Sequence, residues 1–183
     1  MWSEERLIRN MQVAIRKFEA KDIPYKVKWI NDARNNKYLH YDLPLREDKT
    51  LVWFEKNKDR QDRYDTVILA DGEPVGLIGL LGIDPVNQKA EYYITIGVHE
   101  FKGKGVADEA SQLILQYAFE VLKLNKVYLY TETENVNAQR LFERVGFRKE
   151  GLLVNDLICN GRKVDRFYYG ITFEEYNSGS NHN

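Results

Sequence analysis

Lys102-Gly103-Lys104-Gly105-Val106-Ala107 is the stretch of sequence that decides the fold. It follows a run of β-branched and aromatic residues, 92–96, that predicts a strand. It leads into apolar residues that repeat at helical intervals from Val106 to Leu122. Glycine lets the backbone approach a ligand closely, and the free N–H groups in the first turn of a helix favour an anion. A pyrophosphate would fit such a loop.

Other interpretations of this glycine loop exist. A glycine pair before a helix often makes only a tight turn, and the loop alone leaves that interpretation open. A P-loop fits worse, because Lys104 is followed by Gly105 and Val106 rather than by serine or threonine. The dinucleotide-binding fingerprint also fits worse, because its third glycine is missing and the preceding elements do not form a βαβ unit.

The loop resembles the coenzyme A signature of the GNAT superfamily of N-acetyltransferases, Gln/Arg-x-x-Gly-x-Gly/Ala, with Lys102 in the position of glutamine or arginine. Asn135-Val136-Asn137-Ala138, followed by residues 141–147, is similar to the family's Asn-x-x-Ala…Leu-Tyr-x-x-x-Gly-Phe segment. Two signatures in the right order are more specific than either alone. Further stretches resemble the branch that contains ribosomal-protein and spermidine N-acetyltransferases, and they are Trp29–Asp32, Asp71–Gly76, Ala90-Glu91, Glu150-Gly151, Asn160-Gly161 and Asp165.

The patterns predict an α/β fold with a mixed sheet and helices on both sides. The resemblance implies the GNAT (acyl-CoA N-acyltransferase) fold, in which two central strands, here 91–98 and 127–133, splay apart. We expect one domain over residues 13–176, an N-terminal extension over 1–12 and a disordered tail over 177–183. The predicted strands are 13–18, 66–70, 75–83, 92–96, 127–130, 147–158 and 163–173. The predicted helices are a short one that begins with Asp22 as its N-cap and ends between residues 31 and 36, and those over 47–58, 106–122 and 136–145.

The resemblance also implies acetyl-CoA as co-substrate. In the family the pantetheine arm binds beside the splayed strand, whose main chain polarises the thioester carbonyl, and the glycine loop holds the pyrophosphate. Asn135 either binds the cofactor arm or caps the helix that follows it, and both roles are compatible. The expected cofactor-binding residues are therefore Ile96, Gly97, Val98, Lys102, Gly103, Lys104, Gly105, Val106, Ala107, Asp108 and Asn135.

The acceptor amine must lose a proton before it attacks the thioester, so a carboxylate, or a water held by one, is needed as a base. Glu91, at the start of the splayed strand, and Asp156, in the next-to-last strand, are the candidates. Each carboxylate also has the ordinary interpretation of a solvated or ion-paired charge. For Asp165 we expect a structural pairing.

One position departs from the family pattern. Many members have a tyrosine where this chain has Phe142, and its phenol is thought to protonate the departing thiolate. Phenylalanine has no proton to donate. Either water or another group protonates the thiolate, the thiolate leaves unassisted, or the enzyme is slow. The departure also motivates a second hypothesis, in which the chain is a non-catalytic module that binds or senses acyl-CoA.

Composition limits the partners. The net charge of −1 provides no general attraction to nucleic acid, and the N-terminal residues include no continuous apolar segment for export or membrane insertion. We therefore expect no nucleic acid, no membrane and a cytoplasmic location. The one cysteine and three histidines lack metal-ligand spacing, so no metal is expected.

The sequence does not identify the acceptor. A protein or peptide N-terminus, a polyamine and an amino-sugar are all compatible with the motifs, and a homodimer is left open. The first two helices and the last hairpin are expected to shape the acceptor pocket. Asp42, Glu47 and Asp48 in that region either attract a cation or are simply solvated.

Overall fold

The computed structural model describes residues 11–180, which fall into two compact units. The first unit comprises residues 11–79 and 94–114, and the second comprises 80–93 and 115–180. In chain order the elements are β1 (Val13–Lys17), η1 (Ala20–Asp22), α2 (Ile23–Asn31), α3 (Glu47–Asn57), β2 (Arg63–Ala70), β3 (Glu73–Asp84), β4 (Lys89–Ile96), η2 (His99–Phe101), α4 (Val106–Gln116), η3 (Tyr117–Val121), β5 (Lys126–Glu132), α5 (Val136–Val145), β6 (Arg148–Cys159), β7 (Arg162–Thr172) and α6 (Phe173–Ser180).

The strands form one seven-stranded sheet with the order β1-β2-β3-β4-β5-β7-β6. Strands β4 and β5 run parallel, whereas β1 and β2, β5 and β7, and β6 and β7 are antiparallel. The sheet is therefore mixed, as the order of strand and helix patterns predicts.

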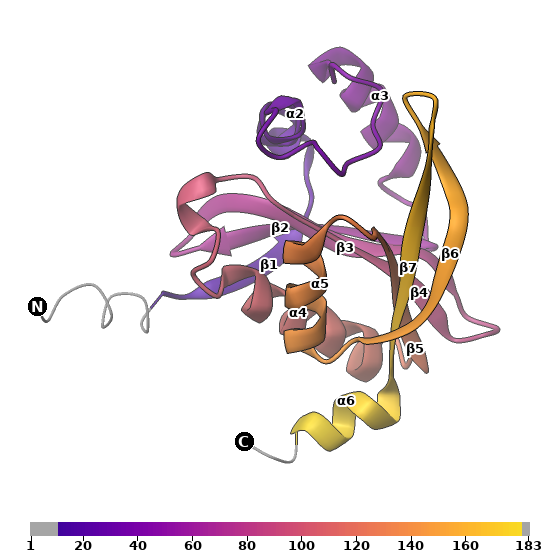
Figure 1. The fold of residues 1–183 in the computed structure, drawn as a ribbon. Coiled ribbons are helices and arrows are strands. Elements are labelled where there is room, and N and C mark those ends of the chain that lie inside the picture. The colour runs from indigo at the N-terminus through magenta and orange to yellow at the C-terminus, as the bar shows by residue number, and fades with distance from the viewer. Residues whose placement is uncertain (1–10, 181–183) are drawn as a thin grey trace, which may run out of the picture. The chain divides into compact units, whose positions relative to one another are not determined.

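In the first unit, β1 pairs with β2 from Val13 opposite Ala70 to Lys17 opposite Thr66. Helices α2 and α3 lie side by side (Figure 1). Consecutive residues of β2 and β3 are buried, which gives the unit an aliphatic core; Val67, Ile68, Val75 and Ile78 are at most 1% exposed, and Ile30 of α2 is fully buried. This core supports the end of β4 and the start of α4.

Asp22 shows a local difference from the sequence prediction. It precedes α2 as expected, but its side chain makes no capping hydrogen bond to that helix. Its carboxylate instead accepts hydrogen bonds from the Arg16 guanidinium at 2.7 and 2.8 Å and from the Glu19 N–H at 2.9 Å. The nearly buried Asp22 therefore ties the start of α2 to β1.

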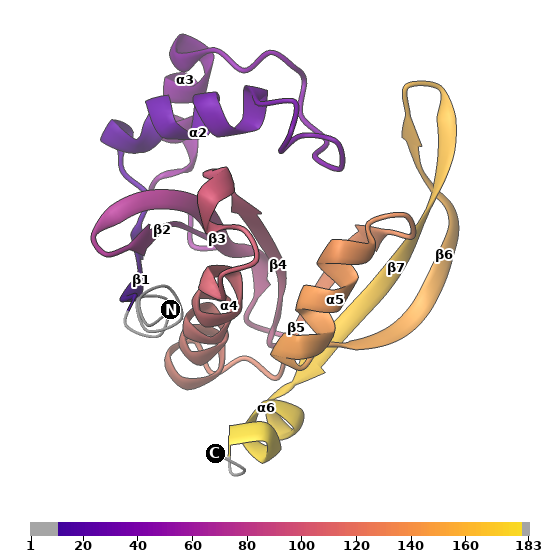
Figure 2. The same cartoon turned by 60° about the vertical axis from the view of Figure 1, so that its left-hand side comes forward.

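In the second unit, β7 pairs with β5 on one side and with β6 on the other, and α5 lies along β5 and β7 (Figure 2). The long β6–β7 hairpin turns at Asn160 and Gly161, whose φ angles are 49° and 75°. These positive values are those that an Asn-Gly hairpin turn requires. Gly146 ends α5 with a φ of 115°, which confirms the predicted stop.

Helix α6 differs from the expected disordered tail, because residues 177–180 are helical. Thr172 and Glu175 form a reciprocal cap: the Thr172 N–H donates to the Glu175 carboxylate at 2.9 Å, and the Glu175 N–H donates to the Thr172 hydroxyl at 3.2 Å. Phe173 and Tyr176 contact Phe119 with ring-centroid distances of 6.1 and 5.0 Å. Residues 1–10, most of the expected N-terminal extension, and 181–183 lie outside the described part of the chain.

Between residues 11 and 180, none of the helices combines the length and the apolar character needed to span a bilayer.

Candidate active site

The glycine loop joins η2 to α4 in the first unit. Gly103 and Gly105 have φ angles of 73° and 81°, and no heavy atom lies within 4 Å of a Cβ built on either residue. Both positions therefore need glycine for its backbone conformation, and the space beside them is open. Helix α4 begins at Val106, as predicted, and the N–H groups of its first turn lack intrahelical acceptors. This arrangement fits a diphosphate.

The end of β4 is fixed by main-chain hydrogen bonds. The N–H groups of Gly97 and Val98 both donate to the Val75 carbonyl, at 2.8 and 3.2 Å. Two consecutive donors on one acceptor are typical of a β-bulge. The Gly97 and Val98 N–H groups are thus engaged on the β3 side. A role of the main chain of Ile96, Gly97 and Val98 in polarising the thioester stays a prediction.

Gly97 packs against α2 more closely than the sequence indicates. A Cβ built on Gly97 would lie 2.1 Å from Cγ of the Trp29 indole. The Gly97 carbonyl also accepts a hydrogen bond from the Asn35 side chain at 3.0 Å. The sequence analysis did not identify Asn35, and no local pattern points to it, because its partner lies 62 residues away along the chain.

Asn135 is in the second unit at the N-cap of α5. Its side-chain oxygen accepts a hydrogen bond from the Ala138 N–H at 3.3 Å, which confirms the capping role. Its main-chain N–H donates to the Glu132 carbonyl at 3.0 Å. A contact of Asn135 with the cofactor arm stays a prediction.

The two candidate bases lie in the second unit in different environments. Glu91 is half-buried and is opposite Tyr128 in the last pair of the β4–β5 ladder. Burial raises the pKa of its carboxyl group, and Arg166 opposes that shift. Asp156 accepts a hydrogen bond from Nε of Arg166 at 2.7 Å and forms an ion pair with the same guanidinium at 2.5 Å. The role of either carboxylate as the base stays a prediction.

The β4–β5 ladder is short. It comprises Lys89–Glu91 paired with Lys126–Tyr128 and ends there, whereas β5 pairs with β7 along its whole length to Glu132. Asp165 has the expected structural role, because its carboxylate accepts a hydrogen bond from the Asn155 N–H at 2.7 Å, at a bulge of the hairpin.

Phe142 belongs to the aromatic core of the second unit. It is 7% exposed, and its ring meets those of Tyr92, Phe147 and Tyr169 at centroid distances of 5.9 to 6.1 Å. The Tyr169 hydroxyl donates to Glu143 at 3.0 Å.

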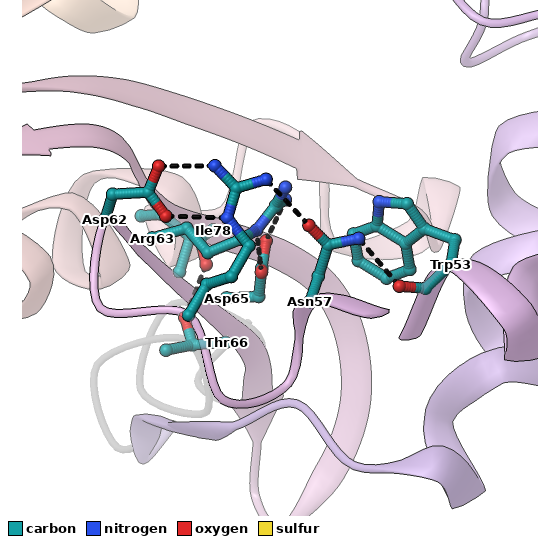
Figure 3. Close-up of polar contacts among 8 residues, drawn as sticks. Trp53, Asn57, Asp62, Arg63, Asp65, Thr66 and Ile78 are labelled. Atoms are coloured by element: carbon teal, nitrogen blue, oxygen red, sulfur yellow. Dashed lines mark hydrogen bonds and ion pairs between the residues drawn. The ribbon is translucent and has the colours of Figure 1, made fainter. Parts of the chain in front are cut away.

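Acidic residues around α2 and α3 are largely bound by nearby arginines. Arg46 holds Asp48, one of the three expected cation-attracting residues, at 3.0 and 2.9 Å, and Arg63 holds Asp65 at 2.6 and 3.0 Å. Figure 3 shows the Arg63–Asp65 pair beside Trp53, whose ring centroid is 5.0 Å from the guanidinium. Asp62 is also bound by a neighbouring arginine. These pairs reduce the field that would attract a polycation.

Comparisons with known proteins agree with this geometry. The family described as Acetyltransferase (GNAT) domain matches residues 12–148. Spermidine N(1)-acetyltransferase of Escherichia coli K12 is 33% identical over 151 residues, which cover 82% of this chain and 80% of that protein. The putative ribosomal N-acetyltransferase YdaF of Bacillus subtilis is 33% identical over 177 residues, which cover 91% and 94%.

A solved structure is similar over the same extent. The spermidine N-acetyltransferase of Vibrio cholerae, crystallised with CoA and spermine, has a TM-score of 0.84 and 29% identity, with 91% of this chain and 98% of that chain covered. Motifs, fold and relatives agree: the chain belongs to the GNAT family of acetyl-CoA-dependent N-acetyltransferases.

Proposed function

We propose that the chain acetylates a primary amine by direct attack of the amine on the thioester of acetyl-CoA, with both substrates bound in one ternary complex. The amine nitrogen forms a bond to the acetyl carbon and the carbon–sulfur bond breaks. One proton leaves the attacking nitrogen, and one proton is taken up by the thiolate of CoA. The reaction therefore needs a proton acceptor for the amine nitrogen and a proton donor for the thiolate.

The single observation that carries this proposal is the environment of Glu91. It is a half-buried carboxylate that, among residues 11–180, has no ion pair as close as that of Asp156, and burial raises its pKa, which favours its role as a base. We assign proton acceptance, directly or through water, to Glu91. Asp156 holds Arg166, which keeps that cation next to Tyr130 at 4.5 Å from the ring centroid.

The loop 102–108 would bind the diphosphate of the cofactor through its main-chain N–H groups, and the Ile96 main chain would bind the thioester carbonyl. The supporting observations are the left-handed Gly103 and Gly105, the start of α4 at Val106 and the family match. Together these groups would orient the thioester and stabilise the oxyanion that forms on attack.

Acceptor candidates are a peptide or protein N-terminus, a polyamine and an amino-sugar. Relatives named for spermidine favour a polyamine, whereas the arginine-bound Asp48 and Asp65 favour an acceptor with fewer charges. A panel assay separates them: spermidine, a peptide with a free N-terminus and glucosamine, each with acetyl-CoA, and release of free thiol as the readout.

The second candidate function, an acyl-CoA sensor, is motivated by the buried Phe142, which supplies no acidic proton. Both functions predict that acetyl-CoA raises the melting temperature, because ligand at about 100 times its Kd stabilises the folded state by about 2.7 kcal/mol. Only the enzyme releases thiol with an amine. Cofactor binding without thiol release from any amine would support the sensor.

A further inference from the structure

Asn35 connects three segments of the first unit through one side chain. Its amide nitrogen donates to the Trp29 carbonyl at 3.1 Å and to the Gly97 carbonyl at 3.0 Å. Its amide oxygen accepts a hydrogen bond from the Lys102 ammonium at 2.7 Å. The half-buried Asn35 therefore links the end of α2, the bulge at the end of β4 and the first residue of the glycine loop.

The contact of Asn35 with Gly97 fixes the last polar main-chain group of that residue. The Gly97 N–H is held by the Val75 carbonyl at 2.8 Å, and the Trp29 indole fills the space where a side chain would be. Asn35 holds the remaining polar group, the carbonyl. Gly97 is thus held by a different segment at its N–H, at its carbonyl and at its Cα.

The contact with Lys102 directs that side chain to the segment after α2. Burial lowers the pKa of the Lys102 ammonium, Asp32 raises it, and Arg34 lowers it again. The hydrogen bond to the neutral amide of Asn35 gives the ammonium a fixed partner next to the repelling Arg34. Lys102 therefore serves as a tether of the loop as well as a cation near it.

We infer that Asn35 is a positioning residue for the cofactor, because its one side chain holds both the β4 bulge and the glycine loop in a single geometry. The inference rests on the proposed function, in which these two segments bind acetyl-CoA. With Asn35 in place, the loop is ordered before the cofactor arrives, so less conformational entropy is lost on binding.

Asn36 provides a matched control. It is also half-buried, and its amide nitrogen donates to the Ile30 carbonyl at 3.2 Å, so it contacts the end of α2 in the way that Asn35 does. Within residues 11–180, Asn36 makes no hydrogen bond to Gly97 or Lys102. Comparing the two residues separates support of α2 from positioning of the cofactor segments.

The experiment compares Asn35→Leu, Asn35→Asp and Asn36→Leu by calorimetric titration with CoA, by the melting temperature of the free protein, and by steady-state kinetics. We expect Asn35→Leu to raise the Kd for CoA and the KM for acetyl-CoA about tenfold, the factor that corresponds to roughly one lost hydrogen bond. The KM for the amine should not change. Asn35→Asp keeps an acceptor for Lys102 but loses both donors, so we expect an intermediate increase.

A double-mutant cycle tests the contribution of the Asn35–Lys102 hydrogen bond. If Asn35 acts in part through Lys102, Asn35→Leu combined with Lys102→Met weakens CoA binding by less than the product of the two single effects. The inference is overturned if Asn35→Leu and Asn36→Leu have CoA Kd values within twofold of each other. It is also overturned if the double variant raises the Kd for CoA by the full product of the factors of Asn35→Leu and Lys102→Met. If Asn35→Leu does not fold, Asn35→Asp and Lys102→Met provide the same comparison. Absence of CoA binding by the unmutated protein would instead refute the proposed function.

Discussion

Replacement of Gly97 by alanine tests how tightly the end of β4 packs on α2. A Cβ at position 97 would lie 2.1, 2.2 and 2.5 Å from three ring atoms of Trp29, whereas carbon atoms in favourable contact are about 3.5–4.0 Å apart. The Trp29 side chain is 3% exposed, and its ring stacks on Tyr25 at a centroid distance of 5.5 Å. The indole therefore has to move by more than about 1 Å among packed neighbours.

The size of the effect follows from this overlap. Overpacking of a core usually costs about 1–3 kcal/mol, and the close approach to a rigid ring places Gly97→Ala at the upper end. We expect the free energy of unfolding to fall by about 3 kcal/mol. For a chain of this length that corresponds to a decrease of about 6–12 °C in the melting temperature.

The assay is denaturant unfolding of Gly97→Ala, with Gly151→Ala as the matched control. No heavy atom lies within 4 Å of a Cβ at Gly151, so we expect that variant to change stability by less than about 0.5 kcal/mol. In a Trp29→Leu background the clash is absent, and Gly97→Ala should cost less than about 1 kcal/mol. The reasoning is refuted if Gly97→Ala is as mild as Gly151→Ala, or if Trp29→Leu leaves its cost unchanged.

Three further predictions concern ionisable and aromatic groups. Glu91→Gln should lower kcat/KM about 10²–10⁴-fold and abolish the acid limb of the pH–rate profile. In the unmutated enzyme this limb should lie above pH 4.5, the ordinary pKa of a glutamate, because burial raises the pKa of Glu91. An unchanged limb would exclude Glu91 as the base. Burial lowers the pKa of Lys26 from 10.5 to about 8, so its contribution to the free energy of unfolding should be greatest above pH 10.5 and be lost as the pH falls through 8, by about 3 kcal/mol at most. The loss should be smaller to the extent that the Trp53 ring, whose centroid is 3.5 Å from the ammonium, attracts the charge. In denaturant unfolding, Lys26→Met should lack this increase in stability between pH 8 and 10.5. Tyr92→Phe should lower kcat at least about 10²-fold if that phenol protonates the thiolate, and Phe142→Tyr should restore the rate in the double variant. An unchanged kcat in Tyr92→Phe would exclude the role.

Local patterns predicted the elements whose stability is itself local. The Asn160-Gly161 turn and the stop of α5 at Gly146 need positive φ angles, which the residue types indicate directly. Helix α6 was missed because asparagine, serine and glycine after residue 176 indicated disorder. The capping pair Thr172 and Glu175 was the available signal, and packing on Phe119 stabilises the helix beyond its weak propensity.

The candidate site was predictable only in part. Glycines before a helix identify the loop, because backbone conformation limits the residue type there. The Asn35 contacts with Gly97 and Lys102 join residues 62 and 67 positions apart, and they depend on tertiary packing that no periodicity encodes. The ion pair of Asp156 with Arg166 is likewise absent from any local pattern, so the sequence left both bases open.

Gly97 and Lys102 are constrained both by the packing of the first unit and by their expected contact with the cofactor. Variants at either position must be interpreted with both constraints in mind. Resemblance assigns both to the cofactor, whereas their contacts within the first unit are with Val75, Trp29 and Asn35. A substitution at either position therefore changes the packing of the unit and the binding of the cofactor together. Loss of activity alone cannot distinguish these effects, but affinity for CoA measured beside the stability of the free protein can. A variant that weakens CoA binding at unchanged stability identifies a residue that acts on the cofactor.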